Sequence, residues 1–262
     1  MGRSTGFRDI DSLLGGLRSG QLWSILGEPS VGRSALAALW AGQRARHEAV
    51  GLLSLRDAAA VVAARLFAAP TRVPLQAILA GQVRPEHRER LALERSTLSG
   101  KSIVFATNAE DLAAMLDQVE VIIVDDAELL GDDVHEYLPA IRDWCDSAGG
   151  AAILTAPISR ATTYRGDQRE LDPTWSGVCD VVMEVRRDDN SERVSARPGQ
   201  ADIVVLRHRL GPTDTVTVAF QGHYARFTDI PFNTDPLRPT GWYTESHHLT
   251  VTCMPGRRSQ NY

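Results

Sequence analysis

Lysine is almost missing from this sequence of 262 residues: Lys101 is the single lysine, and arginine supplies the other basic side chains. Cysteine is scarce too, and the three cysteines lie far apart, without the spacing of a metal site. Basic charge is not in excess, because the formal net charge is −5. These absences argue against a zinc module, a disulfide framework and a chain-wide basic surface for nucleic acid.

Long apolar runs are also missing. No stretch approaches the roughly 18 residues that a membrane-spanning helix needs. The first residues, MGRSTGFRDI, lack the apolar core of a signal peptide. We therefore expect a cytoplasmic protein with no membrane partner. The length suits one large α/β domain at the usual domain size.

Apolar stretches of strand length alternate with stretches of helical character over the first two thirds of the chain. Strands are expected at residues 21–26, 50–55, 102–106, 119–126 and 151–156. The alternation predicts an α/β fold with a mainly parallel central sheet flanked by helices. Beyond residue 178 apolar stretches follow one another without a helix, which predicts antiparallel C-terminal strands on the same sheet. We expect residues 1–230 to form one domain and the proline-rich residues 231–262 to form a tail.

One glycine-rich turn lies between a predicted strand and a predicted helix, in the stretch SILGEPSVGRSALAALW at residues 24–40. Glycines let successive backbone N–H groups point inward, and the helix N-terminus adds partial positive charge, so this turn suits a phosphate. A lysine normally reaches the outer phosphates of the nucleotide, and a serine hydroxyl ligates Mg²⁺. The expected ligands are ATP and Mg²⁺, with a simple glycine turn as the alternative. The predicted nucleotide-binding residues are Gly27, Glu28, Pro29, Ser30, Val31, Gly32, Arg33 and Ser34.

A second acidic element follows the apolar run VIIV. Asp125 stands at the predicted carboxyl end of a buried strand, where an aspartate beside a phosphate loop holds Mg²⁺. Asp125 and Ser34 are therefore the predicted metal ligands. Asp126 has a weaker claim, and the alternative is that both aspartates simply begin a loop.

These features occur in an order that resembles the C-terminal motor domain of DnaB-type replicative helicases. The resemblance is carried by STGFRDIDSLLGGLRSGQLWSILGEPSVGRSALA, VPLQAILAGQV, VVMEVRRDD, ADIVVLRHRLGPTDTVTVAF and YARF. It covers residues 4–230 and implies a RecA-like P-loop fold that uses ATP and Mg²⁺ to unwind DNA in replication. It also implies a hexameric ring on single-stranded DNA. The N-terminal domain of that family is expected to be missing.

Two further groups of arginines take their expected roles from the resemblance. Arg207 and Arg209 match the basic residues that one subunit of the ring donates to the ATP of its neighbour, the alternative being an exposed edge strand. A loop in the position of a DNA-facing loop is rich in arginine around Tyr164 and suits single-stranded DNA. The alternative for that loop is a solvated segment with compensating acids. Its predicted DNA-binding residues are Arg160, Arg165 and Arg169.

Several positions depart from the family pattern. Arg33 replaces the lysine of the phosphate loop, and the swap is not conservative at a close-fitting phosphate site. Arg56 stands where the family has its catalytic glutamate, and Asp57 beside it is expected to cap the next helix. Pro157 stands where the family has a glutamine, and residues 125–137 are short and acidic. These changes predict weak or lost ATP hydrolysis.

Three interpretations stay open at this point. The chain is a helicase-type ATPase in which Arg33 serves as a poor lysine. It is instead a catalytically inactive pseudo-ATPase, acting as a regulatory or scaffold partner of a helicase ring or of another replication protein. The third interpretation is a recombinase-like or sensor ATPase of the wider RecA class, although the terminal strands fit the helicase better.

Overall fold

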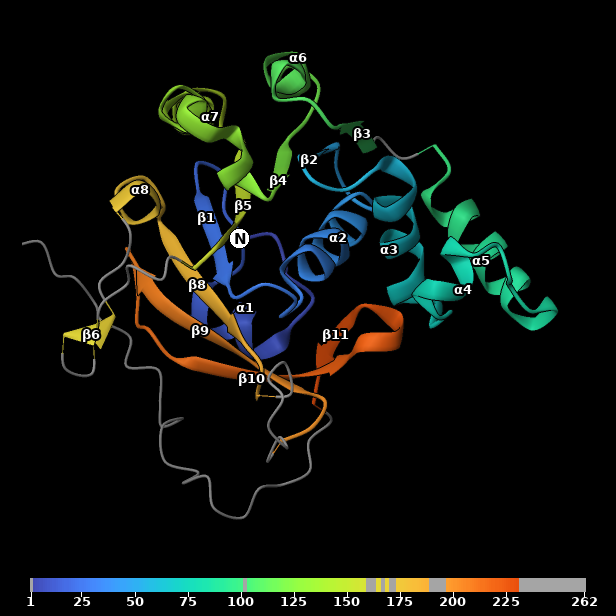
Figure 1. Ribbon diagram of the computed structural model, residues 1–262. Coiled ribbons are helices and arrows are strands. Elements are labelled where there is room, and N and C mark those ends of the chain that lie inside the picture. The colour runs from blue at the N-terminus through green and yellow to red at the C-terminus, as the bar shows by residue number, and fades with distance from the viewer. Residues whose placement is uncertain are drawn as a thin grey trace, which may run out of the picture. The chain divides into compact units, whose positions relative to one another are not determined.

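The computed structural model describes residues 2–100, 103–158, 164–165, 168–169, 173–188 and 197–230. The chain divides into two units, Met1–Ile230 and Pro231–Tyr262, and every described residue belongs to the first. The first unit is built on one nine-stranded sheet, with the strand order β11-β10-β9-β8-β1-β5-β4-β2-β3 (Figure 1).

The strands of this sheet carry the following bounds in chain order. They are β1 Leu22–Gly27, β2 Val50–Ser54, β3 Ile103–Ala106, β4 Val121–Asp125, β5 Ala151–Pro157, β8 Val181–Arg186, β9 Gln200–His208, β10 Thr215–Gln221 and β11 Arg226–Asp229. A separate two-stranded hairpin consists of β6 Tyr164–Arg165 and β7 Gln168–Arg169.

The sheet is parallel from β3 to β8 and antiparallel from β8 to β11. This confirms the mainly parallel sheet with antiparallel C-terminal strands that the sequence predicts. Strand β8 departs from the expectation on one edge: it pairs antiparallel with β9 but parallel with β1. Among the described residues between β5 and β8, the helix is the short α8, Pro173–Ser176, which gives little sign of a crossover in the sequence.

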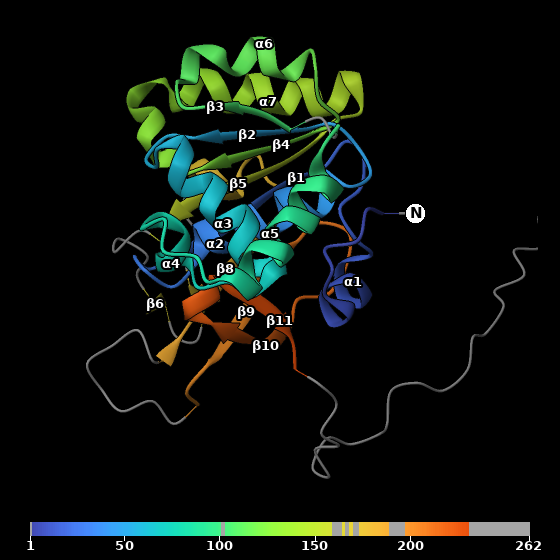
Figure 2. The same cartoon turned by 90° about the vertical axis from the view of Figure 1, so that its right-hand side faces the viewer.

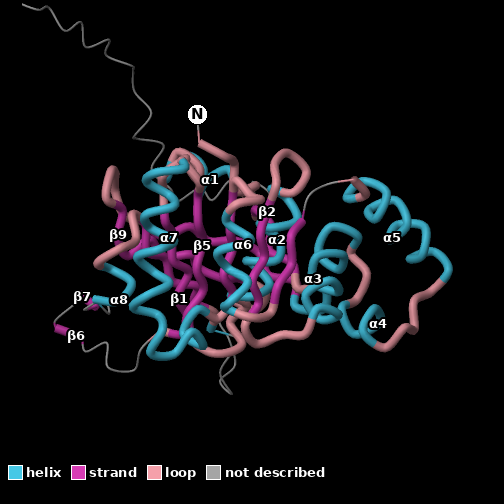
Figure 3. Tube along the Cα trace, turned by 90° about the horizontal axis from the view of Figure 1, so that it is seen from above, coloured by secondary structure: helices cyan, strands magenta, loops and turns pink. Residues whose placement is uncertain are grey.

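Helices cover both faces of the sheet (Figures 2 and 3). The helices are α1 Arg8–Leu14, α2 Arg33–Arg44, α3 Ala59–Thr71, α4 Leu75–Leu79, α5 Pro85–Leu98, α6 Leu112–Leu116, α7 Val134–Ala148 and α8 Pro173–Ser176, with short 3₁₀ turns η1 Ala109–Asp111, η2 Ala127–Asp133 and η4 Gly222–Tyr224. Residues of α1, α2 and α3 belong to one core cluster, and residues of α6, α7 and α8 belong to the other.

Strand β1 shows why this sequence forms the middle of a covered sheet. Trp23 and Ile25 belong to the core cluster under α2, whereas Leu22 and Leu26 belong to the cluster under α7. Successive side chains of a strand point to opposite faces, so an unbroken apolar run is needed where both faces are covered. The carboxyl end of β1 is thereby held rigidly, and the glycine loop begins there.

Helix α3 begins later than the sequence predicts. The expected N-cap at Asp57 is wrong, because α3 begins at Ala59 after an N-cap at Ala58 that makes no side-chain cap. Asp57 instead forms an ion pair with Arg65, a little over two turns along the chain. An ion pair with a side chain of α3 therefore takes the place of a backbone cap.

Candidate nucleotide site

The glycine loop joins β1 to α2 and requires glycine at both ends of its turn. Gly32 has φ 110°, in the region that favours glycine, and a Cβ there would lie 2.8 Å from the ring of Phe227. A Cβ on Gly27 would lie 2.8 Å from Val31 Cγ2 and 2.9 Å from the carbonyl oxygen of Val185. Strand β11 and the end of β8 therefore set the path of this loop.

Arg187, directly after β8, holds the outer side of the loop. Its Nη1 donates to the carbonyl oxygens of Ser30 at 3.2 Å and Val31 at 3.3 Å. Its guanidinium carbon also lies 4.1 Å from the centroid of the Phe220 ring. The first N–H groups of α2 lack intrahelical acceptors, and Gly32 supplies no side-chain cap, so this helix N-terminus suits an anion.

The two predicted metal ligands meet beside the loop. Asp125 ends β4 with only 3% of its surface exposed, and the Thr155 hydroxyl donates to its Oδ1 at 2.6 Å. Burial raises the pKa of the Asp125 carboxyl above its ordinary value, and the hydrogen bond from Thr155 opposes the rise. Ser34, at the start of α2, also acts on this carboxyl, since its hydroxyl lowers the pKa of Asp125. A serine hydroxyl and a carboxylate on the same side of the loop fit Mg²⁺, which takes oxygen ligands.

The raised pKa of Asp125 has a measurable effect on stability. The folded protein holds this proton more tightly than the unfolded chain. The contribution of Asp125 to the free energy of unfolding is therefore fully present below the ordinary pKa of 3.8 and is lost as pH rises through the folded pKa. We expect Asp125→Asn, which stays neutral, to be more stable than the parent at about pH 7 and to lose that advantage as pH falls. Urea unfolding across a pH series checks this. The exposed Asp117→Asn is the control, and a constant or reversed difference would contradict the assignment.

The side chain of Arg33 is hydrogen-bonded to Asp126. Its Nη2 donates to Asp126 Oδ1 at 3.3 Å, and the two side chains are 9% and 3% exposed. The Nη1 atom of Arg33 is buried and has no hydrogen-bond partner among the described residues. Asp126 adopts φ 59°, a left-handed conformation that aspartate tolerates better than most residues. Asp126 is thus the counter-ion of the loop arginine, a more central role than the sequence indicates for it.

Arg56 binds the other oxygen of the same carboxylate. Its Nε donates to Asp126 Oδ2 at 2.9 Å, and its Nη2 donates to Glu128 Oε1 at 3.0 Å. The hydrogen bond to Asp126 raises the pKa of Arg56, and burial raises the pKa of Glu128. We name Arg33, Asp126, Arg56 and Glu128 the arginine–carboxylate cluster.

The end of β5 completes the surroundings of the loop. Pro157 is paired with Gly27 in the parallel register, so the proline predicted to replace a glutamine lies directly beside the loop. Thr155, two residues earlier, accepts the N–H of Asp126 at 2.9 Å while donating to Asp125. Sequence reasoning missed Thr155, although a polar residue inside the buried run AAILTAP is a usable signal.

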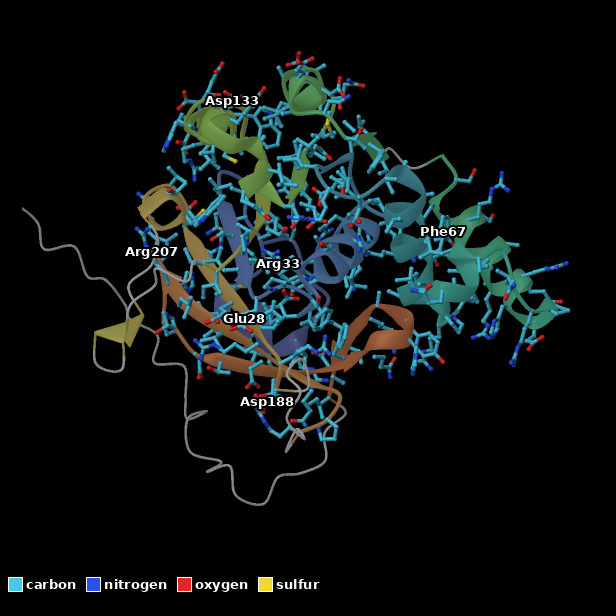
Figure 4. All side chains as sticks on the ribbon, in the orientation of Figure 1. Glu28, Arg33, Phe67, Asp133, Asp188 and Arg207 are labelled. Atoms are coloured by element: carbon cyan, nitrogen blue, oxygen red, sulfur yellow. The ribbon has the colours of Figure 1, made fainter. Side chains whose placement is uncertain are left out.

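Arg207 and Arg209 lie far from the glycine loop of their own chain. Arg207 belongs to β9 and pairs with Val182 near the beginning of β8, and Arg209 donates to Asp180 Oδ1 at 3.1 Å (Figure 4). Asp180 also accepts the N–H of Leu22, so this contact marks the amino end of β1. The loop begins at the carboxyl end of that strand, roughly 16 Å away at the usual rise per residue.

The predicted DNA-binding arginines remain untested. Arg160 lies outside the described residues, and only the backbones of Arg165 and Arg169 are described, in the hairpin β6–β7. Within the described part of the chain, no helix is both long enough and apolar enough to span a membrane. The same part of the chain shows no group of three or more His, Cys, Asp or Glu side chains suited to a metal ion.

The glycine loop after β1, the aspartate ending β4 and the largely parallel sheet define a P-loop domain with a RecA-like fold. The chain belongs to the family described as DnaB-like helicase C terminal domain, whose sequence model matches residues 2–136. This confirms the resemblance that the sequence motifs indicate.

Individual relatives agree with this assignment. The replicative DNA helicase DnaB of Leifsonia xyli subsp. xyli is 28% identical over 256 residues, which is 87% of this chain and 56% of that protein. The DnaB of Geobacillus stearothermophilus is 24% identical over 257 residues, which is 87% of this chain and 57% of that protein. The chain therefore spans a little more than half the length of these curated relatives.

Solved structures share the fold. A DnaB-like replicative helicase, studied for its interactions with primase, superposes with a TM-score of 0.76 at 18% identity, covering 88% of this chain and 62% of that one. A separate structure of an ATPase domain superposes with the same TM-score of 0.76. Its sequence is 19% identical, and the match covers 88% of this chain and 92% of that one. The RadB recombinase superposes with a TM-score of 0.59 at 16% identity, and the match covers 87% of this chain and 99% of that one.

Proposed function

We propose that this DnaB-family domain binds ATP with Mg²⁺ at the glycine loop and hydrolyses it weakly or not at all. The observation that carries this proposal is the ion pair of Arg56 with Asp126, directly after Asp125 at the end of β4. The binding half of a nucleotide site is kept, while a cation stands where the family resemblance expects a catalytic carboxylate.

The chemistry of hydrolysis explains the expected loss. Attack by water on the terminal phosphate needs a group that orients the water or accepts its proton. The guanidinium of Arg56 stays protonated and offers no acceptor. Pro157 stands where the family resemblance expects a glutamine, and proline has no side-chain amide to orient the water or the phosphate. A missing group of this kind typically costs about 10²- to 10⁵-fold in turnover.

The remaining residues fit the nucleotide itself. The N-terminus of α2 and the buried Nη1 of Arg33 offer donors to phosphate oxygens. Ser34 and Asp125 would hold Mg²⁺, which neutralises phosphate charge when it is bound. Arg187 keeps the carbonyl oxygens of the loop turned toward itself, so that they do not face the phosphates.

A regulatory or scaffold role in a helicase ring, or on another replication protein, is the second candidate. The position of Arg209 at the amino end of β1 supports it, because this side chain is 66% exposed there and can face a neighbouring copy. In a ring, whether a homo-hexamer or a mixed assembly, Arg207 and Arg209 would meet that nucleotide. Single-stranded DNA is the proposed partner of the loop that contains Arg160, Arg165 and Arg169.

The test is a paired measurement of ATP binding and ATP hydrolysis on the purified chain, with Mg²⁺ and with or without single-stranded DNA. We expect saturable binding that Ser34→Ala weakens, and turnover no higher than that of this variant. DNA-stimulated turnover well above the variant would contradict the proposed loss of hydrolysis. Absence of any nucleotide binding would favour a nucleotide-free scaffold, and size-exclusion chromatography of the same samples reports whether copies associate.

A further inference from the structure

We propose that Arg33 and Arg56 together form a subsite for the terminal phosphate of a nucleoside triphosphate, so that the site holds ATP in preference to ADP. In this assignment Arg56, at the position where the family resemblance expects the catalytic glutamate, determines the preference for ATP over ADP. The inference rests on the proposed function, since it requires that nucleotide binds at the glycine loop.

The two arginines already surround one anion. Arg33 Nη2 lies 3.3 Å from Asp126 Oδ1, and Arg56 Nε lies 2.9 Å from Asp126 Oδ2. Two guanidinium groups that share the two oxygens of one carboxylate stand side by side. Planar guanidinium groups recognise carboxylate and phosphate oxygens with the same paired donors, so Asp126 occupies a place that suits a phosphate.

The cluster also holds unused donor capacity. Arg33 Nη1 is buried and has no hydrogen-bond partner in the described part of the chain, which is costly for a cationic donor. The bond from Arg33 to Asp126, at 3.3 Å, is longer than the usual 2.7–2.9 Å of a charge-assisted bond. The side chain of Arg56 is 54% exposed, so an incoming anion can reach it. A terminal phosphate carries more charge and more acceptor oxygens than one carboxylate.

The order of the strands assigns the phosphate. The glycine loop follows β1, and the sheet continues from it as β5, β4 and β2. Asp125 ends β4, and Ser54 is its partner in the register of β2, two residues before Arg56. Arg56 therefore lies beyond the metal ligands as seen from the loop. A group that meets both Arg33 and Arg56 is the phosphate farthest from the loop, which ATP has and ADP lacks.

The experiment compares the affinities of ATP and ADP, each with Mg²⁺, by isothermal titration calorimetry. We expect the parent chain to bind ATP about 10- to 100-fold more tightly than ADP, the range for a lost charge-assisted bond. Arg56→Ala should remove this preference by weakening ATP alone. Arg56→Lys, which keeps the charge but not the paired donors, should retain part of it. Arg95→Ala, at an exposed arginine of α5, is the matched control and should behave as the parent.

The outcomes separate this inference from the proposed function. Equal affinities of the parent for ATP and ADP would overturn the subsite while leaving nucleotide binding intact. The subsite is also overturned if Arg56→Ala weakens both nucleotides equally, or neither. Binding of neither nucleotide by the parent would overturn the proposed function and this inference together. Thermal melting of each variant establishes that it is folded before its affinities are compared.

Discussion

Asp126→Asn is expected to lower the free energy of unfolding of the nucleotide-free protein by about 3 kcal/mol. The Asp126 side chain is only 3% exposed and neutralises Arg33, which is itself 9% exposed. Removing one partner of a buried ion pair leaves an uncompensated buried charge, and that charge costs far more than the loss of a surface pair. The substitution keeps the shape of the side chain, so the effect reports charge rather than packing.

The matched control is Asp133→Asn, an exposed carboxylate at the end of the same acidic segment (Figure 4). This substitution should lower the free energy of unfolding by no more than about 0.5 kcal/mol. Urea unfolding with and without Mg·ATP makes the comparison sharper. A triphosphate gives Arg33 and Arg56 a new anion, so ATP should stabilise the Asp126 variant more than it stabilises the parent. An Asp126 variant as stable as the control would show that the cluster does not hold the site together.

The sequence predicted the parts of the site that depend on local pattern. The glycine loop stands between an apolar strand and a helix, and Asp125 ends another apolar strand. Because carboxyl ends of parallel strands meet at one edge of a sheet, their proximity followed from the strand pattern alone. The effect of Ser34 on the pKa of Asp125 agrees with that expectation. The roles assigned to these residues in binding ATP and Mg²⁺ stay predictions.

The arginine–carboxylate cluster could not be predicted in the same way. Arg33 and Asp126 are 93 positions apart, and Arg56 and Asp126 are 70 apart. Their contact depends on the left-handed turn at Asp126, which directs the carboxylate between the two arginines. Nothing in the run VIIVDD specifies that turn. The parallel pairing of β8 was missed for a similar reason, since pairing partners distant in sequence leave no local pattern.

The variant Arg33→Lys/Arg56→Glu is expected to raise ATP turnover by at least about 100-fold over the parent, the amount that one restored catalytic group typically supplies. Arg33→Lys would remove the guanidinium hydrogen bond to Asp126. Arg56→Glu would supply an acceptor for the proton of the attacking water. Ser34, Asp125 and Thr155 remain in place to support the metal.

The two changes should act together, because groups of one catalytic unit are not additive. Arg33→Lys alone still lacks an acceptor for water. Arg56→Glu alone leaves Arg33 bonded to Asp126 instead of free to reach the phosphates. Steady-state ATPase assays of the single and double variants, each paired with the same variant carrying Ser34→Ala, measure the gain. A folded double variant that shows no turnover would contradict this expectation. It would mean that the other changes, at Pro157 and in the segment after β4, also prevent hydrolysis.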